Sequence, residues 1–84
     1  MIQYNIVIDK PAQKFILKQT KQRQEQILRA ISLLPHEGDR KKLEGCPGYF
    51  RLRVGTFRII YTVENNCLTV RIVNAGNRGD IYHK

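Results

Sequence analysis

The chain has few of the residues that build metal centres, disulfide frameworks or membrane spans. Its 84 residues include two cysteines, two histidines, no tryptophan and only seven acidic side chains. Cys46 and Cys67 have no second pair near them, so no zinc-binding spacing can be built, and we interpret them as incidental thiols, with a disulfide left open. No apolar run approaches the roughly 20 residues of a membrane span. We therefore expect no metal, no cofactor and no membrane segment.

The first residues also lack a feature, namely the basic and then apolar arrangement of a signal peptide. We expect a cytoplasmic protein on this ground. A chain of this size buries only about 60–65% of the surface that its unfolded form exposes, which leaves room for one core. Hydrophobic residues make up 42% of the chain, enough for a packed interior. Residues 1–84 are therefore expected to form a single domain.

Positive charge is what the sequence has in excess. Fifteen lysines and arginines oppose seven acidic residues, which gives a formal net charge of +8. An excess this large on a small domain creates a field that attracts phosphate groups or an acidic protein. Composition alone does not decide between these two kinds of partner.

The first half of the chain has the pattern of one strand and two helices. Apolar residues alternate over residues 2–8, as in a half-buried strand. Asp9 offers an N-cap for a helix that ends near Lys18, and Thr20 offers one for a second helix that Pro35 ends. Each predicted helix has one apolar face, so the pair is expected to form a helical hairpin.

The second half has the pattern of an antiparallel meander. Residues 36–48 are polar and rich in glycine, which predicts a loop. Three strands joined by two-residue turns are expected over residues 49–54, 57–63 and 68–74. The fold class is thus predicted as α+β, with an N-terminal strand, a helical hairpin and then a three- to four-stranded antiparallel sheet.

The first turn of this meander fixes the position of three arginines. A two-residue turn at positions 55–56 places Arg53 directly opposite Arg58. Side chains alternate between the faces of a strand, so Arg51 shares their face while the apolar residues occupy the other. One face of the sheet should therefore carry the helical hairpin, and the other should be a cluster of arginines.

The second turn extends the same argument. If residues 65–66 form a two-residue turn, Arg71 lies opposite Ile60 and joins the arginine face. No acidic residue occurs between positions 49 and 63, although like charges placed opposite each other are destabilising. A merely solvated basic face is the simpler interpretation. We favour a phosphate-binding surface, because guanidinium groups match pairs of phosphate oxygens.

The last residues add candidates near the end of the third strand. Arg78 and Tyr82 follow that strand closely enough to reach the edge of the arginine face. Tyr82 also has a simpler interpretation as an apolar plug at the sheet edge. His83 lies one residue from the end of the sequence, where fraying is more common than function.

Three motifs together resemble a known family. They are, in order, Lys42-Leu43-x-Gly45, then Tyr49-Phe50-Arg51-Leu52-Arg53-Val54-Gly55-x-Phe57-Arg58-Ile59-Ile60-Tyr61, then Gly76-Asn77-Arg78-x-x-x-Tyr82. Their combination resembles the RelE/ParE superfamily of bacterial toxins over essentially the whole chain. For RelE-type members, the resemblance implies a metal-independent endoribonuclease that cleaves mRNA in the ribosomal A site. It also implies a cognate antitoxin protein that blocks the toxin.

The resemblance further implies which residues act. The positions that match the family's catalytic pattern are Arg51, Arg53, Arg58, Arg78 and Tyr82. The positions expected to contact RNA are Arg71, Lys41, Lys42 and His83. The sequence departs from the pattern where members often have lysine, at Arg51 and Arg53, and where they often have histidine, at Asn77.

The expected reaction needs a base for the 2′-hydroxyl, positive charge for the phosphorane and an acid for the 5′-oxygen. Arginine stays protonated, so no arginine can be the base. Tyr82 is the first candidate, because guanidinium groups nearby favour its phenolate form, and His83 is the second. The acid has no clear candidate. A site so short of acid–base groups suggests that the ribosome aligns the substrate and that free RNA is cut little.

Two other function classes stay open. ParE-type relatives share the fold, inhibit DNA gyrase and do not cut RNA, but they generally lack this arginine pattern. The other alternative is a basic RNA-binding module without catalysis, which the missing lysines and histidine favour.

Overall fold

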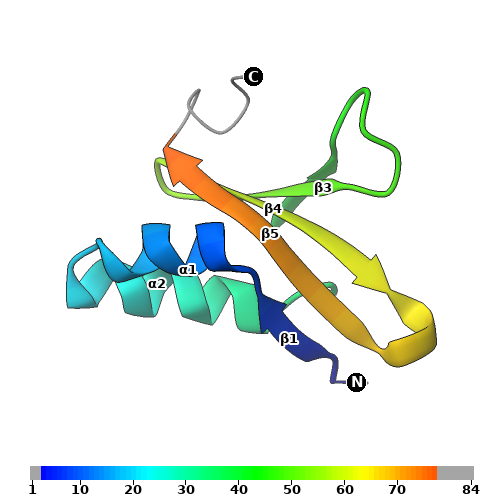
Figure 1. Ribbon diagram of the computed structural model, residues 1–84, viewed down its shortest axis with the longest axis horizontal. Coiled ribbons are helices and arrows are strands. Elements are labelled where there is room, and N and C mark those ends of the chain that lie inside the picture. Colours follow the sequence, from blue (N-terminus) through cyan, green and yellow to red (C-terminus); the bar gives the residue numbers. More distant parts are fainter. Residues whose placement is uncertain (1–2, 78–84) are drawn as a thin grey trace.

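A helical hairpin covers one face of a five-stranded sheet in the computed structural model, which describes residues 3–77 (Figure 1). The fold is α+β, as predicted, and the sheet order is β1-β5-β4-β3-β2. The elements are β1 (Asn5–Ile8), α1 (Lys10–Leu17), α2 (Lys21–Ser32), β2 (Asp39–Lys42), β3 (Phe50–Val54), β4 (Phe57–Glu64) and β5 (Thr69–Asn77), with a short 3₁₀ helix at Asn65–Cys67.

The two helices begin where the sequence predicts. The backbone N–H of Arg23 donates to the Thr20 hydroxyl at 3.2 Å, which satisfies one of the free donors at the start of α2. Asp9 stands at the N-cap position of α1 but makes no side-chain cap hydrogen bond. Its carboxylate instead accepts a hydrogen bond from Nε of Arg71 on β5. Asp9 therefore links the start of α1 to the sheet.

The sheet is mixed, whereas a purely antiparallel one was expected. β1 lies parallel to β5, with Ile6 opposite Val70 and Ile8 opposite Ile72. The meander leaves one edge of β5 unpaired, and β1 fills that edge, so its backbone groups gain partners. The alternation of residues 2–8 predicts a strand, but it carries no information on which strand is the neighbour.

β2 is a strand where a loop was expected. Asp39–Lys42 pairs antiparallel with β3, and all four of its residues are exposed. The segment has no apolar residue, so the alternation that reveals a half-buried strand is absent. Its backbone hydrogen bonds to β3 hold it at the sheet edge.

The connection from β4 to β5 also differs from the expected two-residue turn. The 3₁₀ helix Asn65–Cys67 leads into Leu68, whose φ of +48° is left-handed. Farther from this connection, the pairing of β4 with β5 has an irregularity in its register between Ile60 and Tyr61. The connection is longer than two residues, since Glu64 pairs with Thr69, and this moves Arg71 opposite Thr62, where Ile60 was expected; the irregularity lies beyond that pair. The arginine thus stays on the predicted face but farther along it.

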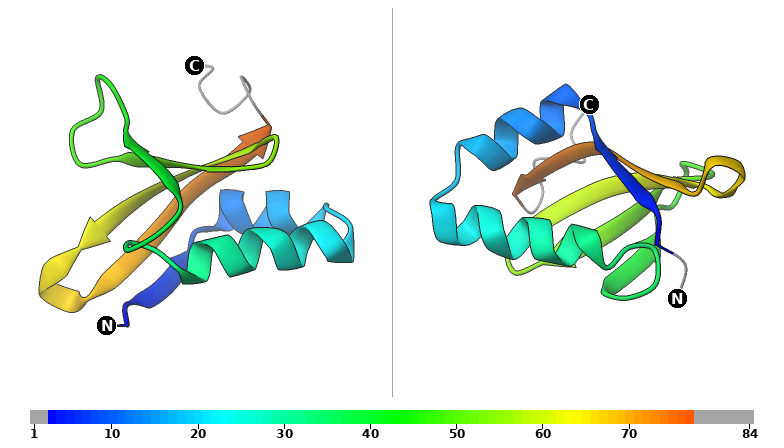
Figure 2. Two further views of the ribbon diagram at one scale, coloured as in Figure 1. Left: turned by 180° about the vertical axis from the view of Figure 1, so that it is seen from behind. Right: turned by 90° about the horizontal axis from the view of Figure 1, so that it is seen from below.

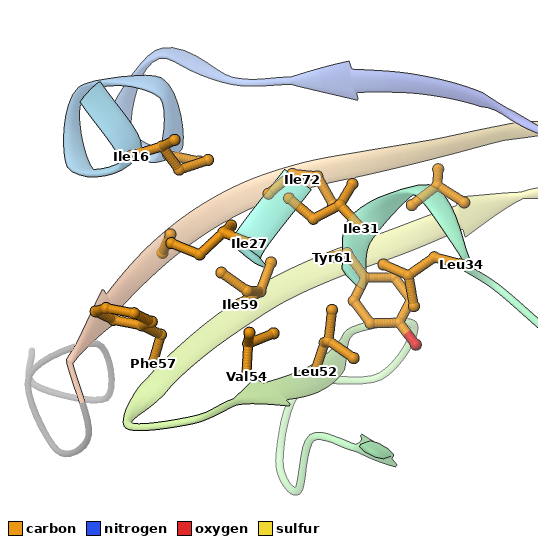
Figure 3. Packing of buried hydrophobic residues seen from close by; sticks show 13 residues of the cluster. Ile16, Ile27, Ile31, Leu34, Leu52, Val54, Phe57, Ile59, Tyr61 and Ile72 are labelled. Carbon is orange, nitrogen blue, oxygen red and sulfur yellow. The ribbon is translucent and has the colours of Figure 1, made fainter. Parts of the chain in front are cut away.

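The core lies between the helices and the sheet face that they cover (Figures 2 and 3). Ile27 and Ile31 of α2 meet apolar side chains of the central strands, among them Leu52 and Ile59. The alternating residues of β3 and β4 that were predicted on the apolar face lie in this core, five of them buried and two, Phe50 and Val63, partly buried. The arginines of these strands consequently point to the face without helices.

We expect Ile59→Ala to lower the free energy of unfolding by about 2–5 kcal/mol, because it deletes most of a fully buried side chain on a central strand. Urea unfolding followed by circular dichroism measures this change. Leu17→Ala is the control, since Leu17 is 71% exposed. A loss of similar size in both variants would contradict the assignment of the core.

Candidate nucleic-acid interface

The face of the sheet away from the helices carries a row of charged side chains. Asp39 on β2 lies opposite Arg53 on β3, which in turn lies opposite Arg58 on β4. The row ends at Gly76 on β5, which has no side chain to occupy the space beside Arg58. The predicted pairing of Arg53 with Arg58 is confirmed, and Gly55 makes the turn with a φ of +59°.

A second row runs parallel to the first. Lys41 lies opposite Arg51, and Arg51 lies opposite Ile60, whose other neighbour is Asn74. We call the four cations of the two rows the basic face; they are Lys41, Arg51, Arg53 and Arg58. This cluster comes from three adjacent strands, and Asp39 is the acidic residue that the pairing places among them.

Arg58 is the most buried member of the basic face. It is only 5% exposed, and its Nη1 donates to the carbonyl of Phe57 at 3.3 Å. Among the described residues, no carboxylate forms an ion pair with it. A guanidinium has five N–H donors, and a buried charge without a partner is unfavourable. Arg58 is therefore suited to bind an anion such as a phosphate.

Asp39 lies between the other two arginines. Its carboxylate oxygens are 3.8 Å from Nη2 of Arg51 and 3.7 Å from Nε of Arg53. Both distances are too long for hydrogen bonds, so the contacts are electrostatic. The Arg51 side chain is 16% exposed, and its buried Nε has no hydrogen-bond partner. These arginines retain donors that an incoming phosphate can use.

Sequence reasoning missed Asp39. No acidic residue occurs between positions 49 and 63, but β2 brings Asp39 to the edge of β3 from the segment expected to be a loop. In the sequence, the only indication that this segment is a separate element is that glycines flank it, at positions 38 and 45. A carboxylate beside two arginines lessens the repulsion that the hairpin alone would produce.

We expect Asp39→Asn to tighten the binding of a short single-stranded RNA by about two- to fivefold at low salt, because it removes the negative charge nearest the basic face. Fluorescence anisotropy at two salt concentrations measures the effect, which should shrink as salt is raised. The control is Glu25→Gln, which makes the same change in net charge at an exposed position of α2. Equal tightening in both variants would show that only net charge matters.

The structure places two of the predicted RNA contacts away from the basic face. Lys42 lies opposite Phe50, so it points to the face that the helices cover. Arg71 is on the same side of the sheet as Arg58. It lies opposite Thr62, however, and Thr62 is four positions from Arg58 along β4, or roughly 13 Å. Its Nε is 3.1 Å from the carboxylate of Asp9. Lys41 is the predicted RNA contact that lies within the basic face.

The remaining predicted residues, Arg78, Tyr82 and His83, lie outside the described residues. Within residues 3–77, no group of three histidine, cysteine, aspartate or glutamate side chains could hold a metal ion. No helix in that range is both long and apolar enough to cross a membrane.

Comparisons with known proteins agree with this architecture. The family model described as the ParE toxin of the type II toxin–antitoxin system parDE matches residues 6–82. A search of curated proteins by sequence found no significant match.

Solved structures share the fold along almost all of their length. RelE in the archaeal RelE–RelB complex from Pyrococcus horikoshii is 26% identical, with a TM-score of 0.77 over 94% of this chain and 99% of that one. The RelBE2 toxin–antitoxin complex from Mycobacterium tuberculosis gives 22% identity and a TM-score of 0.77, covering 92% and 100%. The isolated RelE toxin of E. coli gives 22% and 0.70, covering 94% and 90%. The predicted resemblance is confirmed, and the chain belongs to the ParE toxin family of type II toxin–antitoxin systems, within the RelE/ParE superfamily.

Proposed function

We propose that this toxin is an endoribonuclease that cuts mRNA in the ribosomal A site and so inhibits translation. The observation that carries the proposal is the basic face, above all the pairing of Arg53 with the buried Arg58. Guanidinium groups aligned on neighbouring strands can bind the oxygens of one phosphate and stabilise charge as it develops there.

In the proposed reaction, the 2′-oxygen of the target nucleotide attacks its own 3′-phosphorus after a base removes the 2′-proton. The bond from phosphorus to the 5′-oxygen breaks, and that oxygen takes up a proton. The products are a 2′,3′-cyclic phosphate and a free 5′-hydroxyl. No arginine can accept the first proton, so Arg58, Arg53 and Arg51 bind the phosphate and stabilise the phosphorane. Tyr82 or His83 supplies the base, and Arg78 contributes further charge.

The proposal includes two macromolecular contacts. A cognate antitoxin protein, acidic or amphipathic, binds the toxin in the cytoplasm, in keeping with the RelE–RelB complexes that share the fold. The ribosome presents the mRNA, since the described part of the site lacks a group that titrates near neutrality. Expression of the toxin alone should arrest growth, and expression of the antitoxin gene beside it should restore growth.

A second candidate function is inhibition of DNA gyrase, which the description of the matching family favours. One experiment separates the two. Purified toxin is incubated with programmed ribosomes and a short mRNA, and in parallel with gyrase and supercoiled plasmid. Cuts in the mRNA without trapped gyrase–DNA breaks support the ribonuclease. Trapped breaks without mRNA cuts support gyrase inhibition and overturn the proposal. RNA binding with neither product would indicate a module without catalysis.

A further inference from the structure

The pairing of β5 with β4 contains one extra residue on β5. Ile72 lies opposite Tyr61. Asn74 lies opposite Ile60, the neighbouring residue of β4, so Val73 between them has no partner of its own. An extra residue of this kind is a β-bulge, and bulges are frequent beside active sites, where they redirect a side chain. The bulge therefore decides which of the following residues reach the basic face.

The bulge reverses the alternation of the strand after it. In an uninterrupted strand, Asn74 would share the face of Ile72 and would lie under the helices. With the extra residue, Ala75 lies in the core and is 7% exposed. Asn74 and Gly76 lie on the basic face instead, and Gly76 is the direct partner of Arg58. The bulge thus places an asparagine and a glycine beside the most buried arginine of that face.

The side-chain amide of Asn74 has one fixed orientation. Its Oδ1 accepts a hydrogen bond from the backbone N–H of Ala75 at 2.9 Å. A backbone N–H can only donate, so the oxygen of the amide must be the atom that faces it. The amide nitrogen keeps two N–H donors, and neither is bonded to another residue within the range 3–77. Asn74 is exposed, so these donors are available to a ligand on the basic face.

The surroundings of Asn74 combine a phosphate site with room for a base. Arg58 and Asn74 are diagonal neighbours on β4 and β5, with roughly 7–8 Å between their Cα atoms. This separation is comparable to the reach from a phosphate to the base of the same nucleotide. Gly76 lies next to both residues on that face, and it has no side chain to fill the space. Ile60, the residue opposite Asn74, offers no hydrogen-bonding side chain. The amide is therefore placed to meet the edge of a base while Arg58 binds the phosphate.

We propose that Asn74 selects the nucleotide bound beside Arg58 by donating a hydrogen bond to a keto oxygen of its base, O4 of uracil or O6 of guanine. The inference rests on the proposed function, because it places the scissile phosphate on Arg58. Cytosine and adenine carry an amino group at the corresponding position, and an amino group cannot accept from a second donor. Asn74 therefore favours keto bases over amino bases. The arginines add no such selection, since every nucleotide has the same phosphate.

A second phosphate would suit this amide less well than a base does. Hydrogen bonds between a guanidinium group and a phosphate are charge-assisted and stronger than those of a neutral amide. Arg51 and Arg53 lie on the same face and retain free donors for that purpose. The neutral amide of Asn74 contributes direction and a donor pattern, which are the properties that discriminate between bases.

The test measures the binding of short RNAs to the full-length toxin by fluorescence anisotropy at low salt. Hexauridylate and hexacytidylate are a matched pair, because their bases are of equal size and position 4 carries a keto group in one and an amino group in the other. We expect the toxin to bind hexauridylate about three- to tenfold more tightly, the usual effect of one net hydrogen bond. Hexainosinate and hexaadenylate form the corresponding purine pair. A preference confined to one pair identifies the recognised base as uracil or as a guanine-like purine.

Asn74→Asp is the most direct variant. Its carboxylate keeps the size of the side chain and the acceptor for the N–H of Ala75, but it replaces the two donors by acceptors. A carboxylate can accept from the amino group of cytosine, so we expect the preference to reverse, with hexacytidylate bound about two- to fivefold more tightly than hexauridylate. The added negative charge weakens the binding of both RNAs, so the ratio of the two affinities is the readout. Asn66→Asp is the matched control, because it makes the same change in charge at an exposed position of the 3₁₀ helix and should keep the original ratio.

A second variant keeps the proposal falsifiable if Asn74→Asp does not fold, which circular dichroism shows. Asn74→Ala removes both donors and should bind the two members of each pair equally. The proposal is overturned if the unmodified toxin already binds them equally, or if no hexamer binds saturably at millimolar concentration. It is also overturned if the variants of Asn74 keep the original ratio while all four RNAs bind more weakly, which would indicate a contact to the phosphate or the sugar.

Cleavage on programmed ribosomes is measured separately, so that the two proposals can fail independently. A toxin that cuts mRNA but binds the members of both pairs equally would overturn the role of Asn74 alone. A toxin whose preference reverses in Asn74→Asp but which cuts no mRNA would overturn the proposed nuclease and leave base selection by Asn74 in place.

Discussion

Arg58→Gln is expected to lower the rate of ribosome-dependent mRNA cleavage by about 10²–10³, the usual effect of removing one preorganised group that stabilises a transition state. The expected loss is large because Arg58 is nearly buried and its positive charge has no carboxylate partner among the described residues. Glutamine keeps most of the aliphatic stem, so the substitution tests the charge with little change in packing. Single-turnover cleavage of an mRNA on programmed ribosomes measures the rate.

Two further variants show whether the effect is specific. Arg58→Lys keeps a charge but loses the planar pair of donors, and it should recover only part of the rate. Arg23→Gln removes one positive charge at an exposed position of α2 and should leave the rate of cleavage unchanged. Near-normal cleavage by folded Arg58→Gln would contradict the assignment of Arg58 to the scissile phosphate.

The β3–β4 hairpin was predictable because its determinants are local. Gly55 permits the left-handed turn, and the turn length alone places Arg53 opposite Arg58. Strict alternation then sends Leu52 and Ile59 into the core and the arginines to the other face. The eight consecutive residues from Leu52 to Ile59 contain both the paired arginines and the turn that positions them. The sequence was therefore sufficient to predict this part of the structure.

The position of Asp39 was not predictable for the opposite reason. Its segment has no apolar residue, and it is a strand only because β3 offers a free edge beside it. Its distance from Arg53 depends on the whole connection between the two strands. Sequence reasoning therefore described the basic face as free of acids, while the structure shows a carboxylate among its cations.

The register of β5 shows a third kind of limit. The apolar alternation of the strand correctly predicted that Val70 and Ile72 are buried. The 3₁₀ helix in the connection before β5 nevertheless changed which residue faces Arg71, and the irregularity at Ile60 and Tyr61 changed the pairing only beyond it. Extra residues in a connection leave the burial pattern intact and move the pairing. Arg71 was predicted on the correct face of the sheet. Its neighbour there is Asp9, and the residue opposite Arg71 is Thr62, four positions along β4 from Arg58.

Tyr82→Phe is expected to slow the single-turnover cleavage step by about 10²–10⁴ while ribosome binding stays nearly unchanged, because the phenol oxygen is the first candidate for the general base. The arginines of the basic face cannot accept the proton of the 2′-hydroxyl, but their charge favours a phenolate close to them. Phenylalanine keeps the ring and its packing and removes only the hydroxyl. Cleavage and ribosome binding are measured on the same preparation.

His83→Ala decides between the remaining assignments. If Tyr82 is an apolar plug at the sheet edge, Tyr82→Phe should cut mRNA normally, and a loss in His83→Ala would then make His83 the base. A histidine base would also give a rate that falls as the pH drops below about 6.5, because imidazolium cannot accept a proton. A tyrosine base should give a rate that keeps rising with pH above neutrality. Normal cleavage by both variants would exclude these two side chains, and the base would then have to come from the ribosome or from the RNA in the A site.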